Sequence, residues 1–191
     1  MMRAHPLAAL VHSGPDGPTA DQIALEFHPD EGPRGTRRGH VARPNPLWQA
    51  AAGQPVLAIF GGPQAYVTPS WYASKRDHGK VVPTWNYTVV HAHGALRAVE
   101  DAPWLRALVG RLTDHHEGSR AAPWSVDDAP ADYVQPMLRA IVGIEIAVER
   151  LVGKWKLSQN RNEADRRGVA EGLAAEPGAD ARAMAALLRG S

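Results

Sequence analysis

The chain has 191 residues, 21 of them basic and 20 acidic, and its formal net charge is +1. This length suits one domain with a sizeable core, and the balanced charge gives no overall field that would attract nucleic acid or an anionic membrane. The sequence contains no cysteine, which excludes disulfides, thiolate metal sites and a cysteine nucleophile. No apolar stretch approaches the roughly 20 residues of a membrane helix, so we expect a soluble protein of the cytoplasm.

Strands are predicted where short apolar or alternating runs lie between turn residues. The sequence Ser-Gly-Pro-Asp-Gly at 13–17 is strong turn chemistry and predicts a hairpin or meander between its flanking strands. Glu149 and Arg150 are expected to form the turn between the last two strands. The predicted strands cover residues 6–12, 22–28, 39–43, 56–60, 65–68, 86–99, 140–148 and 151–157.

Helices are predicted where apolar residues recur at helical spacing. Asn45 is a suitable N-cap for the first helix, with Pro46 at its first helical position. Leu105, Leu108 and Leu112 form an apolar stripe in the second. The predicted helices cover residues 45–52, 102–116, 132–138, 163–175 and 179–188.

The order of these elements favours an α+β protein, mainly β. Strands in short steps, a helix inserted mid-chain and two helices at the end predict an antiparallel barrel with helices at its margins, and not alternating βαβ units. Gly61-Gly62-Pro63 lacks the spacing and the following helix of a dinucleotide or phosphate loop. A doubly wound fold is therefore not expected.

Two separate segments are rich in aromatic, hydroxyl and amide side chains. Residues 61–94 read GGPQAYVTPSWYASKRDHGKVVPTWNYTVVHAHG, and residues 154–161 read KWKLSQNR. Aromatic rings interleaved with Ser70, Thr84 and Asn86 indicate a pocket that stacks on a flat molecule and hydrogen-bonds its edges. A core plugged with aromatic rings, beside a solvated Lys-Arg loop, is the alternative that the pattern leaves open. The interpretation carried forward is a planar, anionic cofactor.

Several cations suit the anionic part of such a cofactor. Arg43 precedes a predicted helix start, where N–H groups and a partial positive charge attract anions. Between residues 150 and 167 there are six basic side chains against two acidic ones. Alternation puts Lys154, Lys156 and Ser158 on one strand face. Plain solvent exposure is the alternative explanation for both features.

Other chemistries find less support. His91 and His93 share a strand face and His115-His116 ends a helix, but no third ligand has a spacing diagnostic of a metal or haem site. Ser70 is not within a GxSxG elbow, and nothing nominates its base, so a serine hydrolase is not indicated. We expect no metal.

Four motifs carry a family resemblance over nearly the whole chain. They are HVARPNPLW (40–48), GPQAYVTPSWY (62–72), VPTWNYTVVHAHG (82–94) and IVGIEIAVERLVGKWKLSQNRNEADR (141–166). Together, and in this order, they closely resemble the PaiB-type proteins, described as FMN-binding negative transcriptional regulators.

The resemblance implies an FMN-binding split β-barrel, similar to pyridoxamine phosphate oxidase-like flavoproteins, with peripheral and C-terminal helices. It also implies a homodimer with flavin near the subunit interface. We accordingly expect a split-barrel domain over residues 1–160 and a helical appendage over 161–191, packed on the barrel or on the dimer partner. Family members usually have a further N-terminal segment of about one helix, whereas this chain starts almost on the first strand. The contribution of that segment to the dimer or the pocket is thus in question here.

Matching the family motifs residue by residue gives the expected FMN-binding set. By their chemistry, cations suit the phosphate, indole rings suit the isoalloxazine, and hydroxyls and amides suit its edges. The cations expected at the phosphate are Arg43, Lys156 or Arg161. The indole rings expected on the isoalloxazine are Trp71 and Trp85, and the hydroxyl and amide groups expected at its edges belong to Ser70, Asn86 and Gln159. The remaining matches are Asn45, Tyr72, Thr84 and Ser158.

Two functions of different classes follow. The first is a transcriptional regulator in which FMN is a ligand or sensor. The second is a flavin-dependent oxidoreductase of a small molecule whose regulatory effect is indirect. The sequence offers little equipment for reading DNA, because the last helix has only Arg182 and Arg189 as cations, and the spacing of Met184 and Leu188 favours packing.

Overall fold

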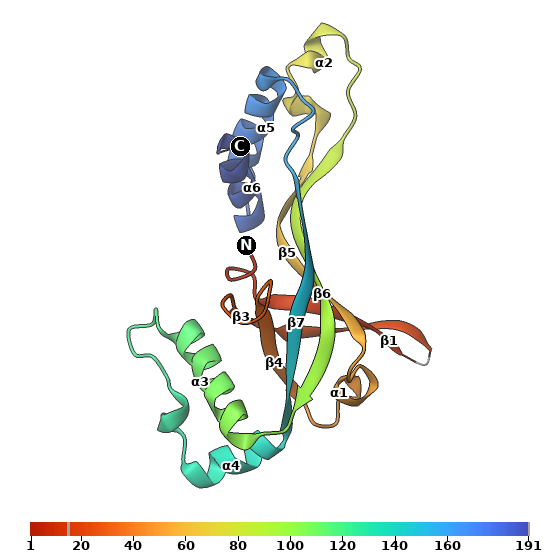
Figure 1. Cartoon of the computed structure of the whole chain (residues 1–191). Helices are drawn as coiled ribbons and strands as arrows, with labels where there is room; N and C mark the ends of the chain where they lie inside the picture. The colour runs from red at the N-terminus through yellow and green to blue at the C-terminus, as the bar shows by residue number, and fades with distance from the viewer. Residues whose placement is uncertain (15, 191) are drawn as a thin grey trace. The chain divides into compact units, whose positions relative to one another are not determined.

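The computed structural model describes residues 1–14 and 16–190 (Figure 1). Pro15, in the predicted turn at 13–17, and Ser191, at the end of the predicted appendage, lie outside the described residues. The strands are β1 (Leu7–Gly14), β2 (Gly17–Ala24), β3 (Glu26–His28), β4 (Thr36–Ala42), β5 (Pro55–Val67), β6 (Thr84–Val99) and β7 (Ile141–Lys156). The α-helices are α1 (Leu47–Ala50), α2 (Ser74–Asp77), α3 (Ala102–Glu117), α4 (Ala131–Arg139), α5 (Glu163–Ala175) and α6 (Ala179–Arg189), with 3-10 turns at Pro69–Trp71 and Val126–Asp128.

The strands form one seven-stranded sheet in the order β2-β1-β5-β6-β7-β4-β3. The predicted hairpin is confirmed, because β1 pairs antiparallel with β2 from Leu7↔Ala24 to Gly14↔Gly17. β4 pairs antiparallel with β7 along its whole length, from Thr36↔Ala147 to Ala42↔Ile141. The predicted α+β class with an antiparallel sheet is therefore confirmed.

Several of the predicted boundaries are wrong. The strand predicted at 22–28 is divided between β2 and β3. The expected turn at Glu149 and Arg150 does not occur, because neither residue brings turn chemistry and β7 continues without a break. The strands predicted at 56–60 and 65–68 are both parts of β5. The first helix is shorter than predicted, and its N-cap is Pro46 in place of the expected Asn45. Asn45 Oδ1 still accepts a hydrogen bond from the Leu47 N–H at 2.8 Å.

The chain divides into two compact units, which we describe separately. Unit 1 comprises Met1–Phe60 and His91–Val152, and unit 2 comprises Gly61–Val90 and Gly153–Ser191. Unit 2 thus joins residues 61–90, most of the first segment rich in aromatic and polar side chains, with the second such segment at 154–161. The expected division at residue 160 stays a prediction.

In unit 1, helix α3 buries the apolar stripe that the sequence predicted. Leu105 and Leu108 of this stripe are 2% and 0% exposed, and Ile144 and Ile146 of β7 are both 0% exposed. Burying one such side chain contributes about 1.5–3 kcal/mol. Asp101 caps the helix by accepting a hydrogen bond from the Trp104 N–H at 2.7 Å.

In unit 2, α5 and α6 pack side by side on the inner face of β5 (Figure 1). The turn between them is made at Gly178, whose φ of 118° favours glycine. Met184 and Leu188 of α6 face this core, as their spacing predicted. The buried side chains that form it are Ala65, Val67, Tyr72, Leu157, Val169, Ala170, Leu173, Met184, Ala185 and Leu188.

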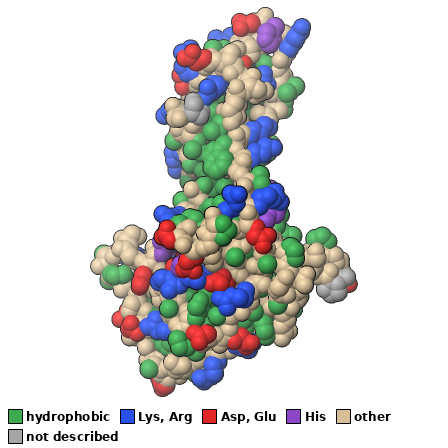
Figure 2. Space-filling model, in the orientation of Figure 1, with side chains coloured by type: hydrophobic (Ala, Val, Ile, Leu, Met, Phe, Trp, Pro, Cys, Tyr) green, Lys and Arg blue, Asp and Glu red, His purple; other side chains and the backbone are tan. Residues whose placement is uncertain are grey.

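Acidic and basic side chains are interspersed over the visible face of the molecule (Figure 2). This distribution agrees with the near-neutral net charge of +1. No helix among residues 1–14 and 16–190 is long and apolar enough to cross a membrane.

We expect Gly94→Ala to destabilise the protein by about 1–3 kcal/mol. A Cβ at Gly94 would lie 2.1 Å from the backbone oxygen of Ala147, so neighbouring strand backbone would have to move. Equilibrium urea unfolding measures the change. The matched control is Gly61→Ala, which meets nothing within 4 Å and should stay within about 0.5 kcal/mol; equal effects of both substitutions would contradict the prediction.

Candidate functional site

Unit 2 brings the predicted motifs of the two segments into direct contact. The Lys156 ammonium donates a hydrogen bond to Thr84 Oγ1 at 2.5 Å, across β6 and β7. The Arg161 guanidinium lies over the Tyr72 ring, 4.4 Å from its centroid. Two cations are thereby held among the hydroxyl and aromatic groups of the neighbouring motifs.

A buried polar pair lies beside these cations. Asn86 and Ser158 are 0% and 5% exposed, and they exchange two hydrogen bonds: the Asn86 amide donates to Ser158 Oγ at 3.0 Å, and Ser158 Oγ donates to Asn86 Oδ1 at 3.2 Å. Ser158 also has a left-handed backbone, with φ of 57°, a conformation that costs about 1–3 kcal/mol for a residue other than glycine. The strand alternation predicted to place Ser158 beside Lys156 therefore ends at Lys156.

Gln159 closes the turn that follows β7. Its Oε1 accepts a hydrogen bond from the Leu157 N–H at 2.8 Å, and its Nε2 donates to the Trp155 carbonyl at 2.5 Å. These bonds hold the turn between Lys156 and Arg161 in one conformation. The role predicted for Gln159, hydrogen bonding to a flavin edge, stays a prediction.

Asp165 connects helix α5 to helix α2, whose first residue is Ser74. It is 2% exposed, and its carboxylate accepts hydrogen bonds from the Ser74 backbone N–H at 2.9 Å and the Ser74 hydroxyl at 2.7 Å. Burial acts to raise the pKa of Asp165, but the bonds from Ser74 and the nearby charge of Arg161 outweigh burial and leave the pKa below its usual value. The carboxylate is therefore ionised at neutral pH, and the charge of Arg161 favours that state.

The motif Ser70, Trp71, Tyr72 forms the 3-10 turn after β5 and the start of the next segment. Thr68 caps the turn by accepting a hydrogen bond from the Ser70 N–H at 3.3 Å, and Lys75 donates to Ser70 Oγ at 3.3 Å. Tyr72 is 2% exposed, and among the described residues its hydroxyl has no hydrogen-bond partner. A buried hydroxyl without a partner costs about 1–3 kcal/mol, so this atom is a candidate for contact with a bound molecule.

Trp71 lies flat against helix α5. A Cβ at Gly172 would come within 2.4 Å of the Trp71 indole, and a Cβ at Gly168 within 2.1 Å of the Trp71 backbone oxygen. Only glycine at these two positions allows the contact.

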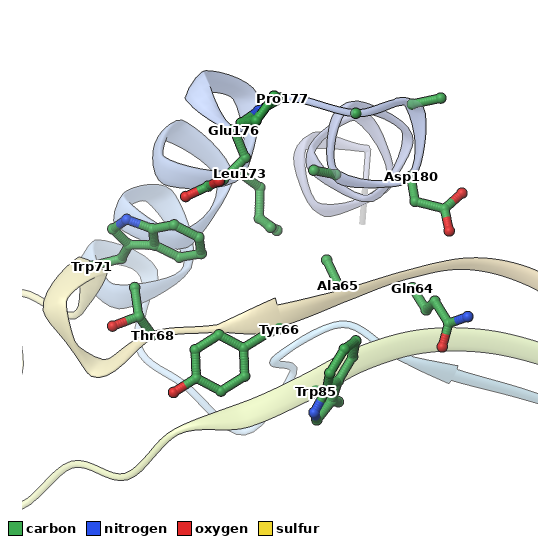
Figure 3. Close-up of a pocket in the computed structure, with 13 residues that line it drawn as sticks. Gln64, Ala65, Tyr66, Thr68, Trp71, Trp85, Leu173, Glu176, Pro177 and Asp180 are labelled. Carbon is green, nitrogen blue, oxygen red and sulfur yellow. The ribbon is translucent and has the colours of Figure 1, made fainter.

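Next to Trp71, unit 2 has an open groove of about 640 Å³, which we call the aromatic groove (Figure 3). Tyr66 and Trp85 line it from β5 and β6, 48% and 54% exposed, and their rings meet edge to face with centroids 6.1 Å apart. These two rings lie on the side of β5 away from the α5–α6 turn, which Ala65 faces (Figure 3). The groove is lined by Gln64, Ala65, Tyr66, Thr68, Trp71, Trp85, Leu173, Glu176, Pro177, Gly178, Ala179, Asp180 and Ala181.

Arg43 and Asn45 belong to unit 1, and their side chains already have partners there. Arg43 donates to the Arg139 carbonyl at 2.7 Å and pairs with Glu100 at 2.5 Å, while the Asn45 amide donates to Asp21 at 2.6 Å. Of the twelve expected residues, these two belong to unit 1 and the other ten to unit 2, and their cofactor roles stay predictions.

Sequence reasoning missed four residues that shape this part of unit 2. Asp165 and Ser74 gave no signal, because a buried ion needs a partner that only the fold supplies. Tyr66 was detectable, since it alternates with buried Ala65 and Val67 along β5. Glu176, in the sequence Glu-Pro-Gly, was read only as a separator between two helices.

The antiparallel sheet with its peripheral helices is the split-barrel fold. One solved structure of this fold is the FAD and heme binding protein from Mycobacterium smegmatis, with a TM-score of 0.61 and 17% sequence identity over 90% of this chain and 74% of that one. At this identity the similarity concerns the fold.

The chain belongs to the family described as "Putative FMN-binding domain", whose model matches residues 1–150, and FMN is the cofactor that this membership assigns. It is 38% identical over 151 residues to protease synthase and sporulation protein PAI 2 of Bacillus subtilis, covering 78% of this chain and 70% of the relative. It is also 38% identical over 192 residues to the uncharacterized protein AFUA_5G13800 of Aspergillus fumigatus, covering 83% and 71%. The predicted resemblance to PaiB-type proteins is confirmed.

We expect Asp165→Asn to destabilise the protein by about 1–3 kcal/mol at pH 7. The pKa of Asp165 is lower in the folded chain than its unfolded value of about 4, so its contribution is complete above that value and is lost as the pH falls through the folded pKa. The difference between variant and parent should accordingly shrink from pH 7 to pH 3 in urea unfolding. Glu163→Gln, an exposed change on the same helix, is the control; a pH-independent difference for Asp165→Asn would contradict the prediction.

Proposed function

We propose that the protein binds FMN through unit 2 and acts as a PaiB-type negative transcriptional regulator of the cytoplasm, with the flavin as ligand or sensor. The observation that carries the proposal is the convergence of the motif at 154–161 with the motifs at 70–72 and 84–86. Lys156 contacts Thr84, Ser158 contacts Asn86, and Arg161 contacts Tyr72. Family membership supports the identity of the cofactor.

The side chains of unit 2 fit the chemical requirements of FMN. Two cations beside hydroxyl groups suit a phosphate, which prefers charge-assisted hydrogen bonds. The orphaned Tyr72 hydroxyl offers one further polar contact. Exposed indole and phenol rings suit a flat tricyclic ring, and when bound the flavin supplies redox chemistry that no side chain of this chain can supply.

Lys156 and Arg161 are the proposed phosphate ligands, with the hydroxyl of Thr84 beside them. Arg43 is the weaker candidate, because Glu100 already neutralises it. Trp71 and Trp85 remain the proposed ring-packing residues. Asn86 is proposed to act by fixing Ser158 in place, since both of its amide atoms are engaged in that buried pair.

We expect Lys156→Met and Arg161→Met each to weaken FMN binding about tenfold or more, since each removes a charge-assisted contact to phosphate and keeps an apolar stem. Quenching of FMN fluorescence during titration gives the dissociation constant. The control is Arg167→Met, which removes an exposed cation of α5 and should leave the constant unchanged. Failure of the parent protein to quench FMN, or an equal effect of the control, would refute the assignment.

The second candidate is a flavin-dependent oxidoreductase, favoured by the open aromatic groove. Its volume of about 640 Å³ is in the range of small-molecule sites. Helix α6 also offers little to DNA: Met184, Ala185 and Leu188 are buried, and Arg182 and Arg189 are its only cations. A regulator built on this chain would therefore contact DNA elsewhere or act through a partner.

Two measurements on FMN-loaded protein separate these classes. An oxidoreductase should show loss of the oxidised flavin absorbance on addition of NADPH or NADH, or reoxidation by a small acceptor. A regulator should leave the flavin inert and retain DNA in a sequence-selective manner that weakens steeply with salt. Flavin turnover without DNA retention would overturn the regulatory proposal in favour of the enzyme.

We further propose that the protein is a homodimer. Residues 149–155 of β7 are all exposed, so both faces of this stretch of strand are uncovered. Leu151, Val152 and Trp155 in it are 36%, 41% and 40% exposed. A strand exposed on both faces with apolar side chains is suited to burial against a second copy.

Light scattering at micromolar concentration should give a mass of two chains. Trp155→Glu should shift the protein toward the monomer, because a carboxylate would be desolvated at the proposed interface. Arg167→Glu, at an exposed position of α5, is the control for the change in charge. A parent protein with the mass of one chain would rule out the dimer.

A further inference from the structure

Unit 1 contains a cavity of about 520 Å³ between helices α3 and α4, which we call the apolar cavity (Figure 1). Strand β4, helix α3, the chain at 124–129, helix α4 and the start of β7 line it. Among the described residues, its lining includes no Asp, Glu, Lys or Arg. The volume is in the range of small-molecule sites, which are mostly apolar with a few polar groups.

The wall at 124–129 is fastened to helix α3 by polar contacts. The Trp124 backbone N–H donates a hydrogen bond to Glu117 Oε2 at 3.3 Å, and Arg106 forms an ion pair with Asp127. These contacts join both ends of the wall to one rigid helix. The cavity is therefore a property of the fold before any ligand binds.

Large apolar side chains that line the cavity are uncovered. Trp124, Tyr133 and Met137 are 49%, 59% and 46% exposed. Of the nine residues of helix α4, only Leu138 is buried, although Val134 and Met137 continue its apolar stripe at helical spacing. Apolar surface gathered around a cavity indicates a binding site, and the rings of Trp124 and Tyr133 suit a flat ligand.

His40 of β4 supplies a hydrogen-bonding group at this site. Its Nδ1 is buried and has no hydrogen-bond partner within residues 1–14 and 16–190, whereas its Nε2 is not buried and has no partner there either. Burial lowers the pKa of His40 below its usual value, so the ring is neutral at neutral pH. Because a buried N–H without an acceptor is costly, we assign the proton to Nε2, which then offers a donor to a ligand.

His40 also borders a second, more polar hollow of about 350 Å³. The hollow and the apolar cavity share His40, Thr113 and Trp124, and the hollow adds His116 and Glu117. A compound whose apolar body fills the cavity would thus place a polar end beside His40, on the side where the polar groups lie.

We propose that the apolar cavity binds a neutral, flat, mainly apolar compound that carries a carbonyl group at one end. Trp124, Tyr133 and Met137 contact the apolar body. His40 donates a hydrogen bond from Nε2 to the carbonyl oxygen. The uncharged lining disfavours an ionic compound, because its charge would lose water without gaining a partner.

This site is separate from the proposed flavin site. None of the twelve residues expected to bind FMN, all of which the structure describes, lines the cavity. Arg43 lies beside it, since its guanidinium donates to the Ile141 carbonyl at 3.2 Å. The inference does not rest on the flavin assignment, and competition with FMN tests the separation.

The test uses the full chain and the neutral fluorescent ketone 6-propionyl-2-(dimethylamino)naphthalene, whose emission moves to shorter wavelength in apolar sites. Displacement of this probe gives the affinities of 2-acetylnaphthalene, of 2-isopropenylnaphthalene, in which a methylene group replaces the carbonyl oxygen, and of naphthalene-2-sulfonate. 2-Acetylnaphthalene should bind at least about tenfold more tightly than the sulfonate. In His40→Phe, the ratio of ketone affinity to alkene affinity should fall about three- to tenfold, because the hydrogen bond is lost.

Met137→Gln should weaken binding of 2-acetylnaphthalene about three- to tenfold, since it places an amide on the apolar wall. Leu7→Gln is the matched control: Leu7 is an apolar residue of unit 1 that is 60% exposed and lies outside the lining, so the affinity should stay unchanged. Circular dichroism with thermal unfolding verifies that each variant folds.

Equal affinities of 2-acetylnaphthalene and the sulfonate, or an unchanged ratio in His40→Phe, would overturn the proposal. Isothermal titration of the ketone in saturating FMN should give the same affinity, and competition would show instead that the cavity belongs to the flavin site. If a second copy filled the cavity, the parent protein would not bind the ketone and Met137→Glu would lower the mass in light scattering, which would also refute the proposal. A failed FMN titration with intact ketone binding would refute the flavin assignment alone.

Discussion

The arrangement of unit 2 depends on two buried polar contacts that fasten the end of the chain to the middle. Asn86 with Ser158, and Ser74 with Asp165, are almost fully buried and satisfied by each other. A buried amide or carboxylate that loses its partner is costly, so alternative registers of the segment after β7 are disfavoured. The positions of Lys156 and Arg161 follow from this constraint, because each lies within four residues of one of the two anchors.

The periodicity of apolar residues predicted secondary structure correctly where alternation or helical spacing alone decided it. The alternating pattern correctly predicted a strand at 86–99, which lies within β6, and the spacing along α3 and α6 correctly predicted their buried stripes. Periodicity failed where contacts between segments distant in the sequence decided the local structure. The strand β7 runs through Glu149 and Arg150 although its pairing with β4 ends at Ala147. Its other neighbour, β6, continues there, with Arg150 contacting His93 at 3.1 Å, which no local pattern reports. The left-handed backbone of Ser158 and the ionised, buried Asp165 were likewise invisible, since both exist only because a distant side chain satisfies them.

The glycines at 168 and 172 lower the stability of helix α5. Each weakens an exposed helix by about 1 kcal/mol relative to alanine, and the two lie one turn apart on the side that Trp71 covers. The indole therefore shields backbone that no side chain of the helix protects. Any molecule that draws Trp71 away would leave this turn open to water and loosen it, while one that holds the ring in place would slow amide exchange along α5, so that the order of the helix reports the state of the neighbouring groove.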